Sequence, residues 1–200
     1  MPDTEQQTER TNIIVGLSGA SGVIMGRYLL EALHPLPNVT THLVITAGAA
    51  DNMTLEQAGT PEDFTRLADY IHDNRDFTAP IASGSFKTAG MVVIPCSMKT
   101  VAGIAVGFAD NLLLRAADVT LKEGRPLLIV PRELPFSALH LKNLHKVAKY
   151  GATVMAPVLT FYNGADTVEK QIQHLIGKIL DRFGLPYAHF RPWKRKGEEK

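Results

Sequence analysis

Residues 12–22, NIIVGLSGASG, decide the fold. Asn12–Leu17 is a short, mostly aliphatic run, which is typical of a buried strand. It leads into a loop of glycines and serines, and Gly22–Leu33 beyond the loop has the residue spacing of an amphipathic helix. A strand, a glycine-rich turn and a helix in this order indicate the first unit of a parallel α/β sheet.

Further apolar runs predict more strands, and helical patterns alternate with them. We expect strands at His42–Thr46, Met91–Pro95, Leu127–Val130 and Thr153–Met155. We expect helices within Thr60–Ile71 and over Thr100–Phe108, Asn111–Glu123, Ser137–Tyr150 and Thr167–Phe183. The strands lack polar alternation, so both of their faces should be buried, as in parallel sheets. The sequence therefore predicts a single-domain, doubly wound α/β sheet with its ligand site at the carboxyl ends of the strands.

Charge and cysteine content limit the classes of partner. The 200 residues include 21 Lys and Arg against 20 Asp and Glu, a net charge of +1. This balance favours neither nucleic acid nor a membrane as partner. The single cysteine, Cys96, and the absence of targeting features in MPDTEQQTER indicate a cytoplasmic protein. We expect a flexible segment over residues 1–10, the ligand-binding domain over 11–193 and a charged tail over 194–200.

The loop Gly16–Gly22 has two interpretations. Its glycines would let a phosphate approach the N–H groups at the helix start, with Ser18 and Ser21 as hydroxyl donors. Alternatively, it is a tight turn built from small residues. The spacing G-x-x-G-x-x-G departs from the dinucleotide fingerprint, and the second strand ends in Thr46 rather than a carboxylate. No Gly-Lys-Ser/Thr follows, which excludes a P-loop, so a mononucleotide fits best.

Polar residues follow two later strands. PCSMKT at 95–100 opens a helix, where Ser97 and Thr100 serve either as N-caps or as ligand donors. The pair Arg132-Glu133 follows the fourth strand, where α/β enzymes place their chemistry; an ion pair at the sheet edge is the alternative.

Other candidates are weaker by pattern alone. Arg115 and Lys122, seven residues apart, share one helix face, which by itself indicates a solvated edge. Cys96 is expected to be a buried thiol. The seven histidines have no zinc-type spacing, so we expect no metal site.

Taken together, these segments resemble the UbiX-like flavin prenyltransferases, including the small B subunits of hydroxyarylic-acid decarboxylase systems. The similarity runs from about Asn12 to Trp193. It is carried by GLSGASG at 16–22, ASGSF at 82–86, PCSMKT at 95–100, DNLLLRAADVTLKEGRPLLIVPRELPFSALHLKNL at 110–144 and AP-x-x-x-FYN at 156–163. The resemblance implies a Rossmann-like or flavodoxin-like fold over residues 11–193, a flavoprotein domain, and a homo-oligomer, typically a dodecamer.

The resemblance also implies an activity. Members of this family transfer a dimethylallyl group from dimethylallyl monophosphate to N5 and C6 of reduced FMN, without a metal. The prenylated FMN then serves a UbiD-like decarboxylase, and both ubiquinone biosynthesis and phenolic-acid decarboxylation are compatible with this chain. Two other functions remain open: an FMN-dependent cysteine-type decarboxylase, and a non-enzymatic flavin-carrying accessory subunit.

Roles for individual residues follow from the same resemblance. The FMN-binding positions are Gly19, Ala20, Ser21, Thr46, Ser97, Met98, Lys99, Thr100 and Arg132. The prenyl-phosphate positions are Arg115, Lys122, Tyr162 and Lys178, and the positions near the reacting atoms are Glu56, Lys122 and Glu133. The cations would stabilise the leaving phosphate. Glu56, Glu133 or the retained phosphate would remove the final proton. The family more often has Arg at position 178 and Thr-Pro where this chain has Leu134-Pro135.

Overall fold

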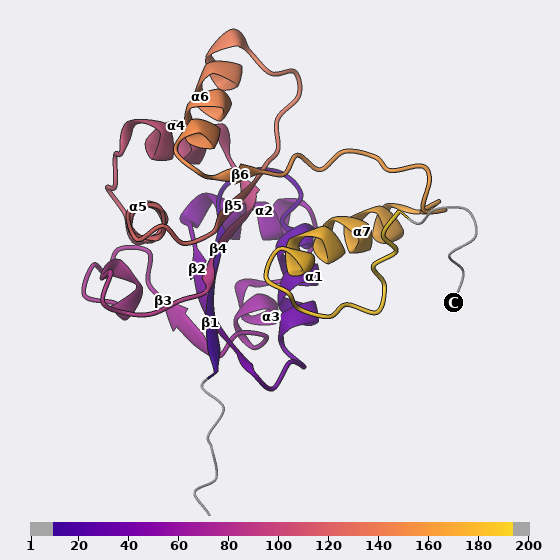
Figure 1. Ribbon diagram of the computed structural model, residues 1–200, viewed down its shortest axis with the longest axis horizontal. Coiled ribbons are helices and arrows are strands. Elements are labelled where there is room, and N and C mark those ends of the chain that lie inside the picture. Colours follow the sequence, from indigo (N-terminus) through magenta and orange to yellow (C-terminus); the bar gives the residue numbers. More distant parts are fainter. Residues whose placement is uncertain (1–9, 194–200) are drawn as a thin grey trace, which may run out of the picture.

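Buried aliphatic runs form one parallel sheet in the computed structural model, which describes residues 10–193. The strands are β1 (Thr11–Leu17), β2 (Val39–Ile45), β3 (Tyr70–His72), β4 (Gly90–Cys96), β5 (Leu127–Pro131) and β6 (Thr153–Val154). Their spatial order is β3-β2-β1-β4-β5-β6 (Figure 1). The direction of winding reverses between β1 and β4, and in such sheets the ligand crevice lies at the carboxyl ends of these two strands.

Polar side chains cap the starts of most of the helices. The helices are α1 (Ile24–Leu33), α2 (Ala47–Leu55), α3 (Pro61–Thr65), α4 (Met98–Val106), α5 (Leu112–Lys122), α6 (Ala138–Lys149) and α7 (Val168–Asp181), with a 3₁₀ turn at Pro80–Ala82. Side chains that accept a backbone N–H of the first turn cap five of them: Thr46, Ser97, Asn111, Ser137 and Thr167. Each cap satisfies an N–H group that would otherwise lack a partner at the helix start.

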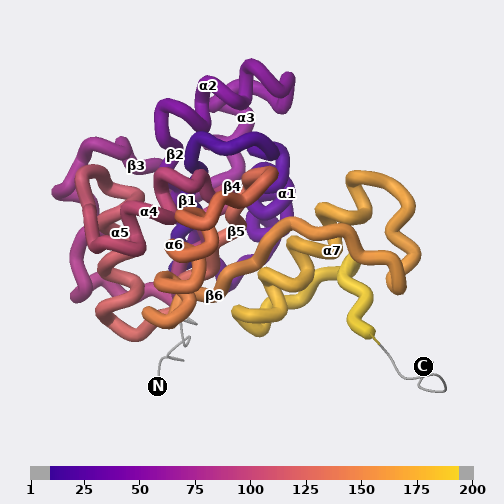
Figure 2. Tube along the Cα trace, turned by 90° about the horizontal axis from the view of Figure 1, so that it is seen from above, coloured from indigo at the N-terminus to yellow at the C-terminus, as the bar shows by residue number. Residues whose placement is uncertain are grey.

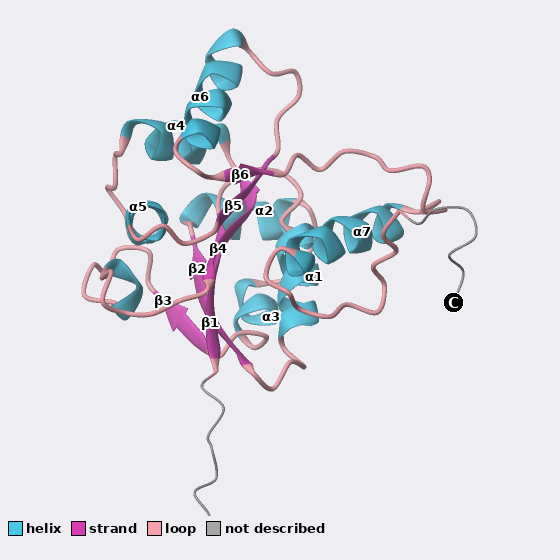
Figure 3. Ribbon diagram, viewed as in Figure 1, coloured by secondary structure: helices cyan, strands magenta, loops and turns pink. Residues whose placement is uncertain are grey.

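Two apolar cores lie on the two faces of the sheet. Ile13 and Val15 of β1 join α1 and α7 in one core, whereas Ile14 joins α4 and α5 in the other. Figure 3 shows the strands between these helix layers, and the view from above in Figure 2 places α5 and α7 on opposite sides of the sheet. Side chains on α5 and α7 are therefore separated by the sheet itself.

The predicted doubly wound parallel sheet is confirmed, and so is a helix within Thr60–Ile71, which is α3. The sequence analysis missed two elements: β3, which begins at the end of that range, and α2. The second strand also begins earlier than expected, at Val39. Its polar Thr41 is buried there because Asp69 accepts from both its backbone N–H (2.9 Å) and its hydroxyl (3.0 Å).

The predicted terminal segments fall almost wholly outside the described residues, which exclude 1–9 and 194–200. Arg10, at the inner end of the first segment, donates to the carbonyl of Val39 and pairs with Asp69 at 3.3 Å. Within residues 10–193, no helix is long and apolar enough to cross a membrane.

Candidate functional site

The loops that follow β1 and β4 are joined through one buried hydroxyl. Ser18 is 1% exposed; its Oγ donates to the carbonyl of Pro95 (3.1 Å) and accepts the N–H of Ser97 (2.8 Å). The sequence analysis offered the Ser18 hydroxyl as a donor to a phosphate. In the structure this hydroxyl instead holds together the loops that follow β1 and β4.

The glycine loop packs directly on the start of α2. A Cβ added to Gly19 would lie 3.1 Å from the carbonyl carbon of Gly48, and one added to Gly48 would lie 3.3 Å from the Cα of Gly19. Only glycines permit two backbones to approach so closely. The packing interpretation of the loop is therefore correct for Gly19, and this contact places the loop beside Thr46.

Glu56 caps the N-terminus of α1. Both of its carboxylate oxygens lie 2.9 Å from the N of Gly22, and Oε2 lies 3.1 Å from the N of Val23. These are the N–H groups that the sequence analysis offered to a phosphate, and here they are already paired with an anion. A phosphate at the same place would be repelled by the carboxylate, so that part of the expectation is wrong.

The starts of α2 and α4 lie at neighbouring strand ends. Thr46 caps α2 by accepting the N–H of Ala49 (3.3 Å). Ser97 caps α4 by accepting the N–H of Thr100 (3.2 Å), and the hydroxyls of Ser97 and Thr100 lie 3.0 Å apart. Met98 and Thr100 are buried, whereas Lys99 is exposed. The N-cap interpretation is confirmed for Ser97, which directly follows β4 at the carboxyl edge of the sheet.

Arg132 connects the end of β5 to the glycine loop. Its backbone N donates to the carbonyl of Cys96 (3.2 Å), and its Nε donates to the carbonyl of Ser21 (3.3 Å). The guanidinium has further N–H groups that these bonds do not use. Glu133, half-buried, accepts the N–H of Leu134 and forms no ion pair with Arg132. The alternative interpretation, an ion pair between Arg132 and Glu133 at the sheet edge, is therefore wrong for these two described residues.

Arg115 and Lys122 of α5, which the resemblance assigns to the prenyl phosphate, lie beside the ASGSF segment at 82–86. Arg115 donates to the carbonyl of Ala82 (3.1 Å) and pairs with Asp118 (2.8 Å). Lys122 pairs with Glu123 beside Gly84. Arg125, which the sequence analysis missed, donates to the carbonyls of Gly84 and Phe86, both at 2.7 Å. Three basic residues thus line the ASGSF segment at 82–86, and no local sequence pattern links Arg125 to it.

Tyr162 and Lys178 lie on the opposite face of the sheet, with α7. The Tyr162 hydroxyl is 3.4 Å from Nε2 of His174, and the Tyr162 ring meets Trp193 edge-on with centroids 5.0 Å apart. Lys178 is exposed on α7. Because the sheet separates α5 from α7, one chain does not bring these two residues together with Arg115 and Lys122.

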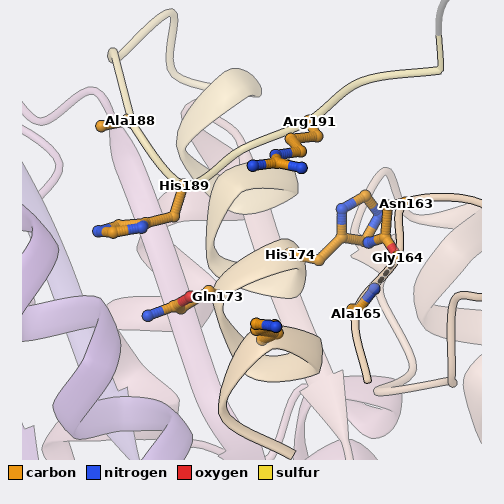
Figure 4. Close-up of a pocket in the computed structure, with 9 residues that line it drawn as sticks. Asn163, Gly164, Ala165, Gln173, His174, Ala188, His189 and Arg191 are labelled. Atoms are coloured by element: carbon orange, nitrogen blue, oxygen red, sulfur yellow. Dashed lines mark hydrogen bonds between the residues drawn. The ribbon is translucent and has the colours of Figure 1, made fainter. Parts of the chain in front are cut away.

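Two hollows adjoin α7. One, of about 210 Å³, is lined by His174, Gln173, Arg191, His189 and the segment 163–165 (Figure 4). The other is an apolar groove of about 380 Å³ between α7, Met25 and residues 157–159. Large apolar side chains beside the groove are exposed, among them Val158, Leu159 and Val168. An exposed apolar surface of this kind is typical of a protein–protein contact.

The strand-end residues fit a flavin mononucleotide. Hydroxyls of Ser21, Thr46 and Ser97 and the guanidinium of Arg132 come from four adjacent strand ends, and they suit one phosphate and a polar ring. Cys96 is fully buried, which raises the pKa of its thiol and makes it an inert core residue, as expected. Within residues 10–193, no three His, Cys, Asp or Glu side chains gather closely enough to hold a metal ion.

Comparison with known proteins agrees with this geometry. The Flavoprotein family model matches residues 2–184. The protein named "Probable UbiX-like flavin prenyltransferase" of Sedimentibacter hydroxybenzoicus is 50% identical over 91% of this chain and 96% of its own.

Two solved structures are similar throughout. A dodecameric FMN-dependent UbiX-like decarboxylase from Escherichia coli O157:H7 has a TM-score of 0.90 and 46% identity, covering 92% of this chain and 100% of its own. A UbiX protein called PadA1, solved with FMN and dimethylallyl pyrophosphate, has a TM-score of 0.90 and 43% identity, covering 94% and 99%. With its sheet order, its strand-end residues and these similarities, the chain belongs to the Flavoprotein family and, within it, to the UbiX-like flavin prenyltransferases.

Proposed function

We propose that this protein is a flavin prenyltransferase, which joins a dimethylallyl group from dimethylallyl monophosphate to N5 and C6 of reduced FMN. The observation that carries this proposal is the hydrogen bond from Arg132 to the carbonyl of Ser21. It lies beside the Ser97 cap, where the direction of winding of the sheet reverses. Family membership favours prenyl transfer over the cysteine-type decarboxylase and the flavin-carrier alternatives.

In this proposal, FMN lies across the carboxyl ends of β1, β2, β4 and β5. Gly19, Ala20, Ser21 and Thr46 contact it from one side, and Ser97–Thr100 and Arg132 from the other. The α1 start is capped by Glu56, so the FMN phosphate is held by hydroxyls and by Arg132 instead. The Glu56 carboxylate then lies at the edge of the same crevice, within the set of groups available for proton transfer.

We further propose that the prenyl-phosphate site forms between copies of the chain. Arg115 and Lys122 lie on one face of the sheet and Tyr162 and Lys178 on the other, so only different copies can bring the two pairs together. The exposed apolar groove beside α7 gives such a contact its apolar surface. A dodecamer, the assembly named for the E. coli relative, is the proposed oligomer.

The chain's own residues would then act on the leaving group and on the protons that are exchanged. Bound reduced FMN would supply the nucleophilic N5 and C6 positions. The charges of Arg115, Lys122 and Lys178 and the Tyr162 hydroxyl would stabilise the phosphate as it leaves, where charge develops. N5 and C6 each give up a proton, and the prenyl double bond takes one up as the bond to C6 forms; Glu56, Glu133 or the departed phosphate would accept and return these protons. No step requires a metal. The product would pass to a UbiD-like decarboxylase, in the cytoplasm.

One incubation tests the proposed function. The purified full-length protein is mixed with photoreduced FMN and dimethylallyl monophosphate, and the released flavin is analysed by mass spectrometry. We expect a flavin that is heavier by one five-carbon prenyl unit. A parallel incubation replaces the prenyl phosphate with a C-terminal cysteine peptide. Loss of carbon dioxide from that peptide would instead establish the decarboxylase, and FMN binding with both flavin and peptide unchanged would establish the carrier.

A further inference from the structure

A buried histidine contacts the hydroxyl of Tyr162. His174, on α7, is 6% exposed, and its Nε2 lies 3.4 Å from the Tyr162 hydroxyl. The two rings meet edge-on, with centroids 5.8 Å apart and planes at 87°. Figure 4 shows His174 projecting from α7 toward the segment 163–165. Its other nitrogen, Nδ1, is buried and has no hydrogen-bond partner among residues 10–193.

The unpartnered nitrogen indicates which tautomer is present. Burial and the charge of Lys178 lower the pKa of His174, so the imidazole is neutral near pH 7 and carries one N–H. On Nδ1 that proton would be a buried donor without an acceptor, which is rare and costly. On Nε2 it faces the oxygen of Tyr162. The contacts therefore favour the Nε2–H form.

Packing holds the His174 ring in place, and Trp193 contacts the Tyr162 ring. Phe190 lies against the His174 ring, with centroids 5.6 Å apart, and it also covers Gly177 one turn further along α7. A Cβ at Gly177 would lie 2.5 Å from Phe190, so the absence of a side chain there lets the C-terminal segment close over the helix. Trp193 packs edge-on against Tyr162. His174 is thus held by packing, whereas Tyr162 is 49% exposed and contacts His174 and Trp193 on the rest of its ring.

We propose that His174 is a positioning residue that orients the hydroxyl proton of Tyr162. By donating Nε2–H to the Tyr162 oxygen, His174 occupies an acceptor position of that oxygen and leaves the tyrosine O–H to donate to the prenyl phosphate. Hydrogen bonds in such a chain polarise one another, so the tyrosine becomes a stronger donor. This inference rests on the proposed function, because it requires Tyr162 to contact the phosphate.

Three single variants separate donation from packing. His174→Phe keeps a ring but removes the donor, His174→Gln keeps an N–H near the Nε2 position, and His174→Asn keeps one only near Nδ1. With reduced FMN saturating, we expect the Phe and Asn variants to lose about 3- to 10-fold in kcat/KM for the prenyl phosphate, the scale of one net hydrogen bond. The Gln variant should recover most of this loss, and FMN affinity should stay within about twofold in all three.

A double variant tests the route of the effect. Because His174 acts only through the tyrosine hydroxyl, His174→Phe should cost nothing further in a Tyr162→Phe background. Any of three results would overturn the positioning role. The first is a double variant whose loss in kcat/KM is the product of the two single losses. The others are equal losses in the Gln and Asn variants and wild-type kinetics in His174→Phe. A wild-type protein that transfers no prenyl group would refute the proposed function, and this inference with it.

Discussion

At the scale of single residues, the most unusual polar pair is His42 and His72. Nδ1 of His42 lies 3.0 Å from Nε2 of His72, its Nε2 lies 3.2 Å from the Asn12 side chain, and the two imidazoles stack. Burial, followed by the nearby His72, lowers the pKa of His42 to about 4. Burial also lowers the pKa of His72, against the opposing effect of Asp76. Asp69 is the carboxylate that opposes the shift at His42.

This pair predicts a loss of stability in mild acid. The unfolded chain protonates both histidines below about pH 6.5, whereas the folded chain resists protonation until the pH is well below that. The free energy of unfolding should therefore fall by roughly 1–2 kcal/mol between pH 7 and pH 5. Urea denaturation at the two pH values measures it. His42→Asn should reduce this dependence of stability on pH. His145 is exposed, so His145→Asn is the control and should leave the dependence unchanged. The same change in stability between the two pH values in both variants would contradict the prediction.

Individual site residues were predictable to different degrees. Ser97 and Arg132 follow apolar strands directly, so their place at the carboxyl edge followed from strand position alone. Tyr162 and Lys178 were found only through resemblance, because no local pattern marks them. The partner of Glu56 was not predictable. Its contact with Gly22 spans 34 residues, and only the folded chain brings the end of α2 to the start of α1.

At the scale of elements, that contact holds α1 and α2 together and gives a second prediction. Glu56→Ala removes the acceptor for the N–H groups of Gly22 and Val23 and the negative charge at the helix start. We expect the variant to lose about 1–3 kcal/mol in the free energy of unfolding. Chemical denaturation of the FMN-free protein tests this. Asp51→Ala, an exposed acidic residue on the same helix, is the matched control, and an equally small loss in both would exclude the capping role.

Elements were predicted best where the signal was local. β1 and α5 match their expected ranges closely because an aliphatic run, or the Asn111 cap with an apolar face, specifies each. α2 was missed because its sequence, AGAADNMTL, has no clear apolar face and only two buried residues. β3 is three residues long and mostly exposed, and it forms by pairing with β2 rather than by its own pattern.

At the scale of the whole molecule, the opposite positions of α5 and α7 predict complementation between inactive chains. We expect Lys122→Ala and Tyr162→Phe/Lys178→Ala each to be nearly inactive alone, since each removes half of the proposed site. Co-assembled at equal amounts, they should regain about a quarter of wild-type activity, because a site between two copies is intact in that fraction of pairings.

Two controls accompany this experiment. Mixing the preformed oligomers without exchange of subunits should give no recovery, and the exchange itself is followed by native mass spectrometry. No recovery after demonstrated exchange would mean that one chain supplies the whole phosphate site, and the proposed assembly would be wrong.

The sheet between α5 and α7 also has a kinetic consequence. With the phosphate site divided between copies, a lone subunit would hold its flavin and yet turn nothing over. The rate per mole of protein would then fall on dilution below the dissociation constant of the assembly, rather than stay constant as it does for a self-sufficient enzyme. In a cell, output would rise more steeply than gene expression, so the fold itself would set a threshold amount of protein below which almost no modified flavin is made.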